Sequence, residues 1–370
     1  MTLFGRLALT RQILARQFGV RFVPLFVLCW FAFVRLLVAL GQGIDALLYP
    51  GGAELLRRPV LIAGVPRSGT TFLHRLMAAD GFGAGSQLFR MVFPSTVLQK
   101  ALRPILPALE WASPTRFHKS EAHDGSLLLE ETDDALMLLR QCDGFLWYAF
   151  FLAWADEELR ALIDPRVQDT FPRDLAWAQR AWIASARAQG RERVIIKSFA
   201  WFAQLPRFLA QVPDARVVVL LRDPARTIPS ALSLVRGPLD KALHANQLPA
   251  EQQARHSRRL AVAMTELYRI FCEDWSSGAI DQSRVKVIPY PRLMQDFEGV
   301  MSELSEFLGH PISDALRAKY ATIGASQRSR VSAHRYTAAR FGLDDAQIRR
   351  ESAFVYELFG PLSESSPEVT

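Results

Sequence analysis

The sequence predicts an α/β fold in which a mostly parallel sheet is flanked by helices on both faces. Short apolar runs of strand length alternate with stretches of helical periodicity, and these runs are residues 60–63, 194–197, 217–221 and 285–288. Runs that are apolar throughout are typical of parallel strands covered on both faces. The chain is 50% hydrophobic and 22% charged over 370 residues, which suits a globular protein with one large domain or two smaller ones.

Helices are expected between and after these strands. The spacing of apolar residues predicts them from Thr70 and from Pro224 onward, and over residues 135–139, 174–188, 255–275 and 293–308. The last of these is closed by Gly309 and stopped by Pro311. Because strand and helix alternate along the chain, parallel pairing of the strands is favoured.

An apolar helical arm precedes the first strand. Residues 1–21 carry four arginines and no acidic residue, and Phe22 to Leu40 is apolar except for Arg35. Such a segment just reaches the length of a membrane span. Three interpretations compete: a buried core helix, a signal-anchor span, or an interfacial helix with arginines among lipid head groups. The interfacial helix uses every feature, and we predict that residues 1–56 form a membrane-associating arm.

The first strand leads into an anion-binding loop. Val60 to Ala63 is followed by a loop with two glycines, Gly64 to Gly69, and then by a helix from Thr70. This geometry points backbone N–H groups and a helix dipole at an anion. The loop resembles a nucleotide-triphosphate loop, but Thr70 stands where the lysine of that motif belongs, and the cation is Arg67 instead. The sequence therefore predicts a P-loop-like cradle for a shorter phosphate chain.

A second set of polar residues follows the third strand. Arg222 ends this strand, Pro224 begins a helix, and Ser230 lies about two turns into it. A guanidinium forks onto a phosphate, and a serine adds a neutral donor. Asp223 has the alternative interpretation of a magnesium ligand, against which the missing loop lysine argues.

These two motifs together carry a family resemblance. Gly64-Val65-Pro66-Arg67-Ser68-Gly69-Thr70-Thr71 resembles the 5′-phosphosulfate loop of sulfotransferases that use 3′-phosphoadenosine 5′-phosphosulfate (PAPS). It is most similar to the bacterial membrane-associated and tyrosylprotein branches. Arg222 and Ser230 resemble the second signature, which binds the 3′-phosphate of PAPS. The resemblance covers roughly residues 59–360, and it implies a PAPS-dependent sulfotransferase domain at 57–360. The last ten residues, 361–370, are rich in Ser, Pro and Glu, and this composition predicts a flexible tail.

Lys197 ends the second strand, where a catalytic site in a parallel sheet is expected. A solvated edge lysine is the alternative. The resemblance favours a catalytic role, because sulfotransferases have a lysine and a hydroxyl residue at this place. Phe199 stands where the cytosolic enzymes have their catalytic histidine, so the proton acceptor must come from elsewhere.

An acidic run at residues 130–134 precedes a predicted helix. It either caps that helix, or it converges with the basic residues at 116–119 beside the acceptor. The membrane-associated branch is similar here, and Glu131 and Asp133 are the best-matching positions. We predict Glu131 or His118 as the base that takes the acceptor's proton.

Two further segments have open interpretations. Residues 145–154 are dense in aromatics and form either core or an apolar acceptor pocket. Near the C-terminus, Arg328 and Arg330 resemble a basic loop that closes over the 3′-phosphate, with a solvated basic segment as the alternative.

Charge and cysteine usage limit the partners. A formal net charge of +7 favours an anionic partner: a nucleotide, a sulfated product or an acidic membrane surface. No basic helix with interleaved aromatics and no zinc-ligand spacing is seen, so nucleic acid is not expected. Three widely separated cysteines favour a reducing compartment. Together with the arm and the cytosolic supply of PAPS, this predicts a membrane-associated protein on the cytoplasmic face, of undetermined oligomeric state.

The sequence thus predicts sulfuryl transfer from PAPS to a hydroxyl, or an amine, on an apolar and lipid-like acceptor, without a metal. The alternatives are a catalytically inactive, membrane-bound nucleotide-binding protein and a divergent P-loop kinase. The predicted catalytic residues are Arg67, Lys197, Glu131 and His118. The predicted donor-binding residues are Arg67, Ser68, Gly69, Thr70, Thr71, Arg222, Ser230, Arg328 and Arg330.

Overall fold

A computed structural model describes residues 1–20, 25–113, 126–329 and 337–362. Within them, parallel strands form one sheet in the order β2-β1-β3-β4. Their bounds are β1 Val60–Ala63, β2 Ile195–Ser198, β3 Arg216–Leu221 and β4 Val285–Pro289. Each agrees with a predicted run to within one residue at either end, and the predicted α/β fold is confirmed.

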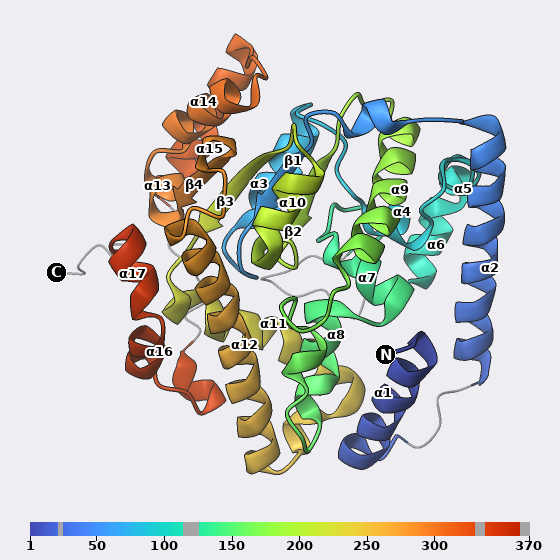
Figure 1. Ribbon diagram of the computed structural model, residues 1–370, viewed down its shortest axis with the longest axis vertical. Coiled ribbons are helices and arrows are strands. Elements are labelled where there is room, and N and C mark those ends of the chain that lie inside the picture. Colours follow the sequence, from blue (N-terminus) through green and yellow to red (C-terminus); the bar gives the residue numbers. More distant parts are fainter. Residues whose placement is uncertain (21–24, 114–125, 330–336, 363–370) are drawn as a thin grey trace.

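The helices surround this sheet (Figure 1). In chain order the α-helices are α1 (Leu3–Phe18), α2 (Leu25–Leu48), α3 (Thr70–Ala79), α4 (Leu88–Val92), α5 (Thr96–Leu102), α6 (Leu106–Ala112), α7 (Asp134–Gln141), α8 (Gly144–Phe150), α9 (Phe171–Gln189), α10 (Leu205–Gln211), α11 (Pro224–Leu243), α12 (Ala250–Ser276), α13 (Tyr290–Gln295), α14 (Phe297–Leu308), α15 (Asp314–Arg328), α16 (Asp345–Glu351) and α17 (Ala353–Phe359).

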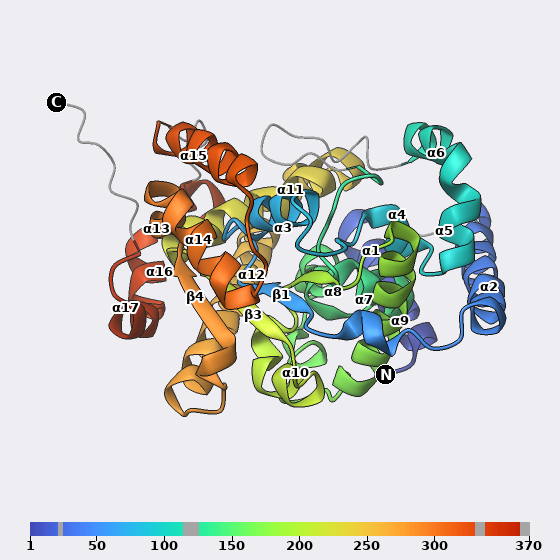
Figure 2. The ribbon, with the colours of Figure 1, turned by 90° about the horizontal axis from the view of Figure 1, so that it is seen from above.

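Side chains of each strand alternate between two cores, one on each face of the sheet. Val60 and Ile62 point into a core that is shared with α3, α13, α14 and α15. Leu61 and Ala63 point into a larger core that is shared with α8 to α12. Figure 2 shows α3 and α15 on one side of the strands and α10 on the other. This double coverage explains why the strands are apolar without alternation.

The strand order places a topological switch point between β1 and β3. From β1 the chain runs to β2 on one side, and then crosses to β3 on the other side of β1. Ligands of open parallel sheets bind beyond the carboxyl ends of the strands at such a point. Here these ends lead directly into the loop from Gly64 and into Arg222.

One predicted helix is divided in two. The segment predicted as a helix at 293–308 is formed by α13 and α14, which meet at Asp296. Asp296 has φ −126° and ψ 55°, outside the helical region, and its side chain accepts a hydrogen bond from the backbone N–H of Gly299. The break arises because this aspartate caps the second helix, which apolar spacing alone does not reveal.

Two α-helices, α1 and α2, lie in the described residues of the N-terminal arm. α1 packs on the body of the protein, where Arg6 is buried and forms an ion pair with Asp143 at 3.3 Å. α2 lies at one edge of the molecule beside α5 (Figures 1 and 2). By length and composition the segment Cys29–Leu48 of α2 is sufficient to cross a membrane, and 11% of its apolar window is buried. A core helix would be mostly buried, so the structure does not support that interpretation.

Candidate active site

The loop after β1 has the backbone of an anion-binding concavity. Gly64 and Gly69 have φ values of 147° and 92°, and Arg67 between them has φ 74°. A left-handed conformation costs a non-glycine residue energy, so its presence at Arg67 marks a loop held by its surroundings. Ser68 completes the turn, since its backbone N–H and its hydroxyl both donate to the carbonyl of Val65, at 3.3 and 2.8 Å.

Both glycines are also required by close contacts. A Cβ on Gly64 would lie 2.5 Å from the carbonyl oxygen of Leu220, on the neighbouring strand β3. A Cβ on Gly69 would lie 2.9 Å from Cε2 of Tyr290. The loop therefore packs directly against β3 and the start of α13.

The loop ends at the N-terminus of α3. The first main-chain bond at this end runs from the N–H of Leu73 to the carbonyl of Gly69, at 3.3 Å. The N–H groups of Thr70, Thr71 and Phe72 precede it and have no acceptor within the helix. Together with the helix dipole, N–H groups in this position are able to bind an anion. Thr70 is buried, whereas Thr71 is half-buried and directs its hydroxyl to Lys197.

In the structure, the second predicted motif, Arg222 and Ser230, contacts the loop after β1. Nε of Arg67 donates to Oγ of Ser230 at 2.9 Å, and Nη1 of Arg222 donates to the carbonyl of Arg67 at 3.1 Å. The Arg222 guanidinium also lies over the ring of Tyr290, 4.0 Å from its centroid. Two cations separated by 155 residues in the chain therefore meet beside one loop.

Lys197 lies next to this loop at the end of β2. It is 6% exposed, and its Nζ donates to Oγ1 of Thr71 at 2.7 Å. Burial lowers the pKa of this amine, and the nearby carboxylates of Glu131 and Asp134 oppose the shift. The amine of Lys197 therefore lies beside the N-terminus of α3, as the catalytic prediction requires. A solvated edge lysine would be exposed, and Lys197 is buried.

The acidic run divides into residues with different environments. Glu131 forms an ion pair with Arg75 of α3 at 2.7 Å. Asp133 and Asp134 are buried and accept hydrogen bonds from β2 and the residues after it. The carboxylate of Asp133, at the N-cap position of α7, makes no capping hydrogen bond there, whereas Asp134 lies in the first turn of α7, as the capping interpretation expects. The carboxylate of Asp133 is directed toward the sheet.

The remaining predicted site residues are His118, Arg328 and Arg330. His118 and Arg330 lie outside the described residues. Arg328 is at the C-terminal end of α15, and its guanidinium lies 3.9 Å from the carboxylate of Glu298 on α14. This ion pair is half-exposed and suits the solvated-segment alternative as well as a loop over the donor.

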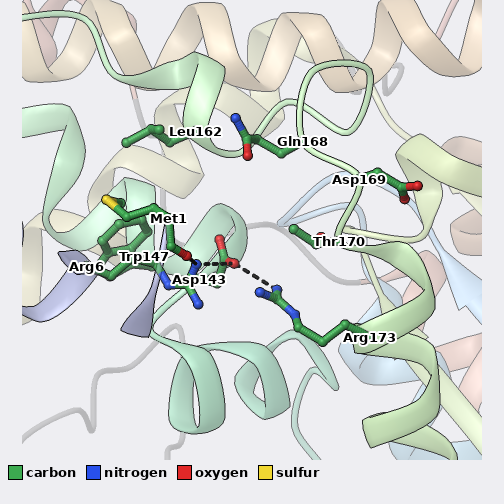
Figure 3. Close-up of a pocket in the computed structure, with 9 residues that line it drawn as sticks. All are labelled: Met1, Arg6, Asp143, Trp147, Leu162, Gln168, Asp169, Thr170 and Arg173. Atoms are coloured by element: carbon green, nitrogen blue, oxygen red, sulfur yellow. Dashed lines mark hydrogen bonds and ion pairs between the residues drawn. The ribbon is translucent and has the colours of Figure 1, made fainter. Parts of the chain in front are cut away.

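The aromatic segment is mainly core. Trp147, Tyr148 and Trp154 are at most 1% exposed, and the ring of Phe145 lies 5.6 Å from that of Phe199, two residues after Lys197. A cavity of about 210 Å³ lies elsewhere, between α1, α8 and the start of α9, where Arg6 and Arg173 both pair with Asp143 (Figure 3). Its charges are already matched, and it is not an acceptor pocket beside Lys197.

Asp223 does not have the environment of a magnesium ligand. It is 1% exposed, and one oxygen accepts from the N–H of Ala225 and the hydroxyl of Tyr356, at 2.9 and 2.7 Å. The other oxygen pairs with Arg349 of α16 at 2.9 Å. The C-terminal helices thereby hold the turn that carries Arg222.

Sequence reasoning missed the partners that position the predicted residues. Arg75 and Thr71 are four residues apart on α3, so they share a helix face, and this spacing was an available signal. Arg349 and Tyr356 had no such signal, because they reach Asp223 from more than 120 residues away.

The comparisons with known proteins agree with this geometry. Residues 59–314 match the profile of the Sulfotransferase family. Sulfotransferase STF9 from Mycobacterium avium superposes with a TM-score of 0.65 at 20% identity, covering 88% of this chain and 82% of that one. Sulfotransferase STF1 from Mycobacterium tuberculosis H37Rv gives 0.63 at 18% identity, covering 95% and 92%. Such low identity shows a shared fold. No curated protein matches the chain.

The family profile begins just before β1 and ends at the start of α15, so it covers more than half of the chain. It includes the loop after β1, Lys197 at the end of β2, and the Arg222 turn. The chain belongs to the sulfotransferase family.

Proposed function

We propose that the protein transfers the sulfuryl group of PAPS to a hydroxyl on an apolar, lipid-like acceptor at a membrane surface. The observation that carries the proposal is the hydrogen bond between Arg67 and Ser230, at 2.9 Å, which joins the two anion-binding motifs into one site. A donor with anionic groups on both the 5′ and the 3′ oxygens of its ribose requires two such motifs side by side. The family match supports the reaction type.

Each motif has a role in this proposal. The N–H groups of residues 67 and 69–71, with the hydroxyls of Thr70 and Thr71, hold the 5′-phosphosulfate. Arg222 and Ser230 hold the 3′-phosphate, through a guanidinium whose plane is set by the ring of Tyr290. Ser68 serves the turn itself, because its hydroxyl donates inward to Val65.

Charge stabilisation is assigned to Lys197 and Arg67. In this proposal both act on the negative charge that develops on the sulfuryl and bridging oxygens, and a fixed cation that is buried, as Lys197 is, acts there more strongly than one in water. Glu131 or His118 takes the acceptor's proton. Glu131 is the described candidate, and its ion pair with Arg75 sets its position beside α3.

The outer face of α2 supports the membrane part of the proposal. Its exposed residues are uncharged from Cys29 to Leu48, and the large ones are Trp30, Phe33, Leu36, Leu40, Ile44, Leu47 and Leu48. Nearby, Ile105 and Trp111 are 48% and 77% exposed. Arg11 and Arg16 of α1 are exposed and supply positive charge for an anionic surface. An apolar face with basic flanks is typical of an interfacial helix.

The inner face of α2 favours lying on the membrane over spanning it. Arg35 donates to the carbonyl of Arg140 at 2.7 Å, and Asp45 accepts from the N–H groups of Thr96 and Val97 at 2.7 and 2.9 Å. These contacts are ten residues apart, about 15 Å along the helix. A spanning orientation would carry α5 into the hydrocarbon with α2, whereas an interfacial one leaves the body in water.

Purified protein and isotopically labelled PAPS test the reaction. Incubation with a lipid extract should give a labelled lipid, and Arg67→Ala should abolish it. Arg226→Ala is the matched control, an exposed arginine on α11, and should retain the activity. Binding of PAPS without any transfer supports the inactive-binding alternative. Labelling from ATP with magnesium supports the kinase alternative.

Flotation with anionic phospholipid vesicles tests the membrane part separately. The full chain should float with vesicles containing phosphatidylglycerol and less with neutral vesicles. A chain lacking residues 1–50 that floats as well as the full chain would exclude the arm as the anchor.

A further inference from the structure

Asp133 forms hydrogen bonds with both main-chain polar groups of Lys197, its N–H and its carbonyl. The N–H of Asp133 donates to the carbonyl of Lys197 at 2.7 Å, and its Oδ2 accepts from the N–H of Lys197 at 2.9 Å. β2 is an edge strand, paired with β1 on its other side, where Ile62 lies opposite Lys197. Asp133 therefore occupies the position that a further strand would take at this residue.

The second carboxylate oxygen of Asp133 is anchored to the body. Oδ1 accepts from the hydroxyl of Ser86 at 2.7 Å and from Nε1 of Trp182 on α9 at 2.9 Å. Asp133 is 0% exposed, and the three groups that contact its carboxylate all donate to it: the N–H of Lys197, the hydroxyl of Ser86 and the indole N–H of Trp182. This environment requires the ionised carboxylate and leaves it out of reach of an acceptor, so Asp133 is not a proton acceptor in the reaction.

Asp134 holds the residues that follow. Its carboxylate accepts from the hydroxyl of Ser198 at 3.0 Å and from the N–H groups of Phe199 and Ala200 at 3.0 and 2.8 Å. Two adjacent aspartates thus hold residues 197–200. At the other end of the Lys197 side chain, Nζ is held by Thr71 of α3 at 2.7 Å.

We propose that Asp133 is a positioning residue for catalysis, which acts through Lys197 by fixing the backbone from which that amine extends. The inference rests on the proposed sulfuryl transfer. A cation stabilises a developing charge only when it is held within a fraction of an ångström of its place. Asp134 supports the same segment one residue further along.

The proposal predicts a pH dependence. Burial raises the pKa of Asp133 to about 6, against the hydrogen bonds from Lys197, Ser86 and Trp182. The charged or titratable groups around Asp133 and Lys197 are Asp134 on α7, Lys197 on β2, Glu131 before α7, and His74 and Arg75 on α3. Below this pKa the carboxyl of Asp133 is protonated, and one of its oxygens can no longer accept from its present donors. Transfer should therefore fall as the pH drops below about 6.

Asp133→Asn tests the role. We expect kcat to fall about 100-fold, the dissociation constant of 3′-phosphoadenosine 5′-phosphate to change less than about threefold, and the acid limb near pH 6 to disappear. Asp174→Asn is the matched control, a buried aspartate of α9 that pairs with Arg173, and should keep kcat and the acid limb. Asp133→Asn combined with Lys197→Met should be no slower than Lys197→Met alone, because one residue acts through the other.

Two results would overturn the inference: an unchanged kcat in Asp133→Asn, or additive losses in the double variant. Should Asp133→Asn fold poorly, Trp182→Phe removes one donor only and should lower kcat several-fold with the same retention of nucleotide affinity. Amide hydrogen exchange at Lys197 gives a readout that needs no turnover, and it should accelerate in Asp133→Asn. Accelerated exchange in a protein that never transfers sulfuryl refutes the proposed function and this catalytic role but leaves the structural contact intact.

Discussion

The carboxyl edge of the sheet and the outer face of α2 differ in which kinds of side chain they bury and which they expose. At the sheet edge, polar and charged groups are buried, and Lys197, Asp133 and Asp134 all have hydrogen-bond partners. On α2, large apolar side chains are exposed, and Leu47 reaches 82%. Each is costly in a water-soluble protein unless something compensates.

The compensation differs between the two regions. At the sheet edge it is internal, since each buried charge is matched by hydrogen bonds from the same chain. On α2 no described segment covers the outer face, and the proposed compensation is a lipid surface. The comparison teaches that a buried polar cluster and an exposed apolar face are both candidate functional surfaces, which our proposal assigns to a small anionic donor and to an extended apolar partner. The following predictions test it.

The largest effect is expected at Lys197. Lys197→Met should lower kcat about 1,000-fold, because it removes a fixed cation from the developing charge. Steady-state kinetics with labelled PAPS measure it. Lys286→Met is the control, a lysine of β4 that pairs with Glu303, and should stay within about twofold of the parent. Equal losses in both variants would contradict a specific role for Lys197.

Gly64→Ala should destabilise the fold by about 3 kcal/mol, because its Cβ would lie 2.5 Å from a backbone oxygen that cannot move easily. Urea unfolding followed by circular dichroism measures the change. Gly237→Ala on α11 meets nothing within 4 Å and should be neutral or slightly stabilising. A parent-like midpoint for Gly64→Ala would show that the loop does not pack on β3 as described.

Polar substitution on α2 tests the other region. The combined change Trp30→Gln, Leu36→Gln, Leu40→Gln and Leu47→Gln should weaken vesicle binding about 50-fold, since four apolar side chains no longer enter the interface. Flotation titrations measure the affinity. Val167→Gln, Val262→Gln and Leu358→Gln change exposed apolar residues elsewhere, and should leave binding unchanged. Equal weakening by the control set would remove α2 as the docking face.

Acid should destabilise the fold through two buried histidines. Burial lowers the pKa values of His74 and His256 from 6.5 to about 3, so below pH 6.5 the unfolded chain binds protons that the folded chain excludes. Stability is therefore present in full above pH 6.5 and is lost as the pH falls toward 3.

The raised pKa of Asp133 acts in the opposite direction and offsets part of this loss. The net loss between pH 7.5 and 5.5 should be about 2 kcal/mol, measured by urea unfolding at both values. His256→Gln keeps a donor for the carbonyl of Ala149 and should remove about two thirds of this net loss. An unchanged slope in that variant would exclude His256 as its source.

The smallest effect concerns the inner face of α2. Asp45→Ala removes the acceptor for two N–H groups at the start of α5 and should cost about 1 kcal/mol of stability, measured by thermal unfolding. Vesicle binding should stay close to that of the parent, since the outer face is intact. A loss of vesicle binding without a loss of stability would reverse the assignment of the two faces.

The sequence by itself determined the strands, the two-glycine loop after β1 and the family. These follow from local chemistry, because an apolar run of strand length, two glycines at fixed spacing and an arginine at a strand end are each read from neighbouring residues. It also indicated the α2 segment, where a long apolar run stands beside arginines.

Only the tertiary structure decided which charges meet. Asp133 reaches Lys197 across 64 residues, Arg67 reaches Ser230 across 163, and Arg349 reaches Asp223 across 126. The same is true of the break at Asp296, and of which face of α2 packs on α5. The physical reason is that burial and hydrogen bonding depend on neighbours in space, and the order in which strands join a sheet sets those neighbours.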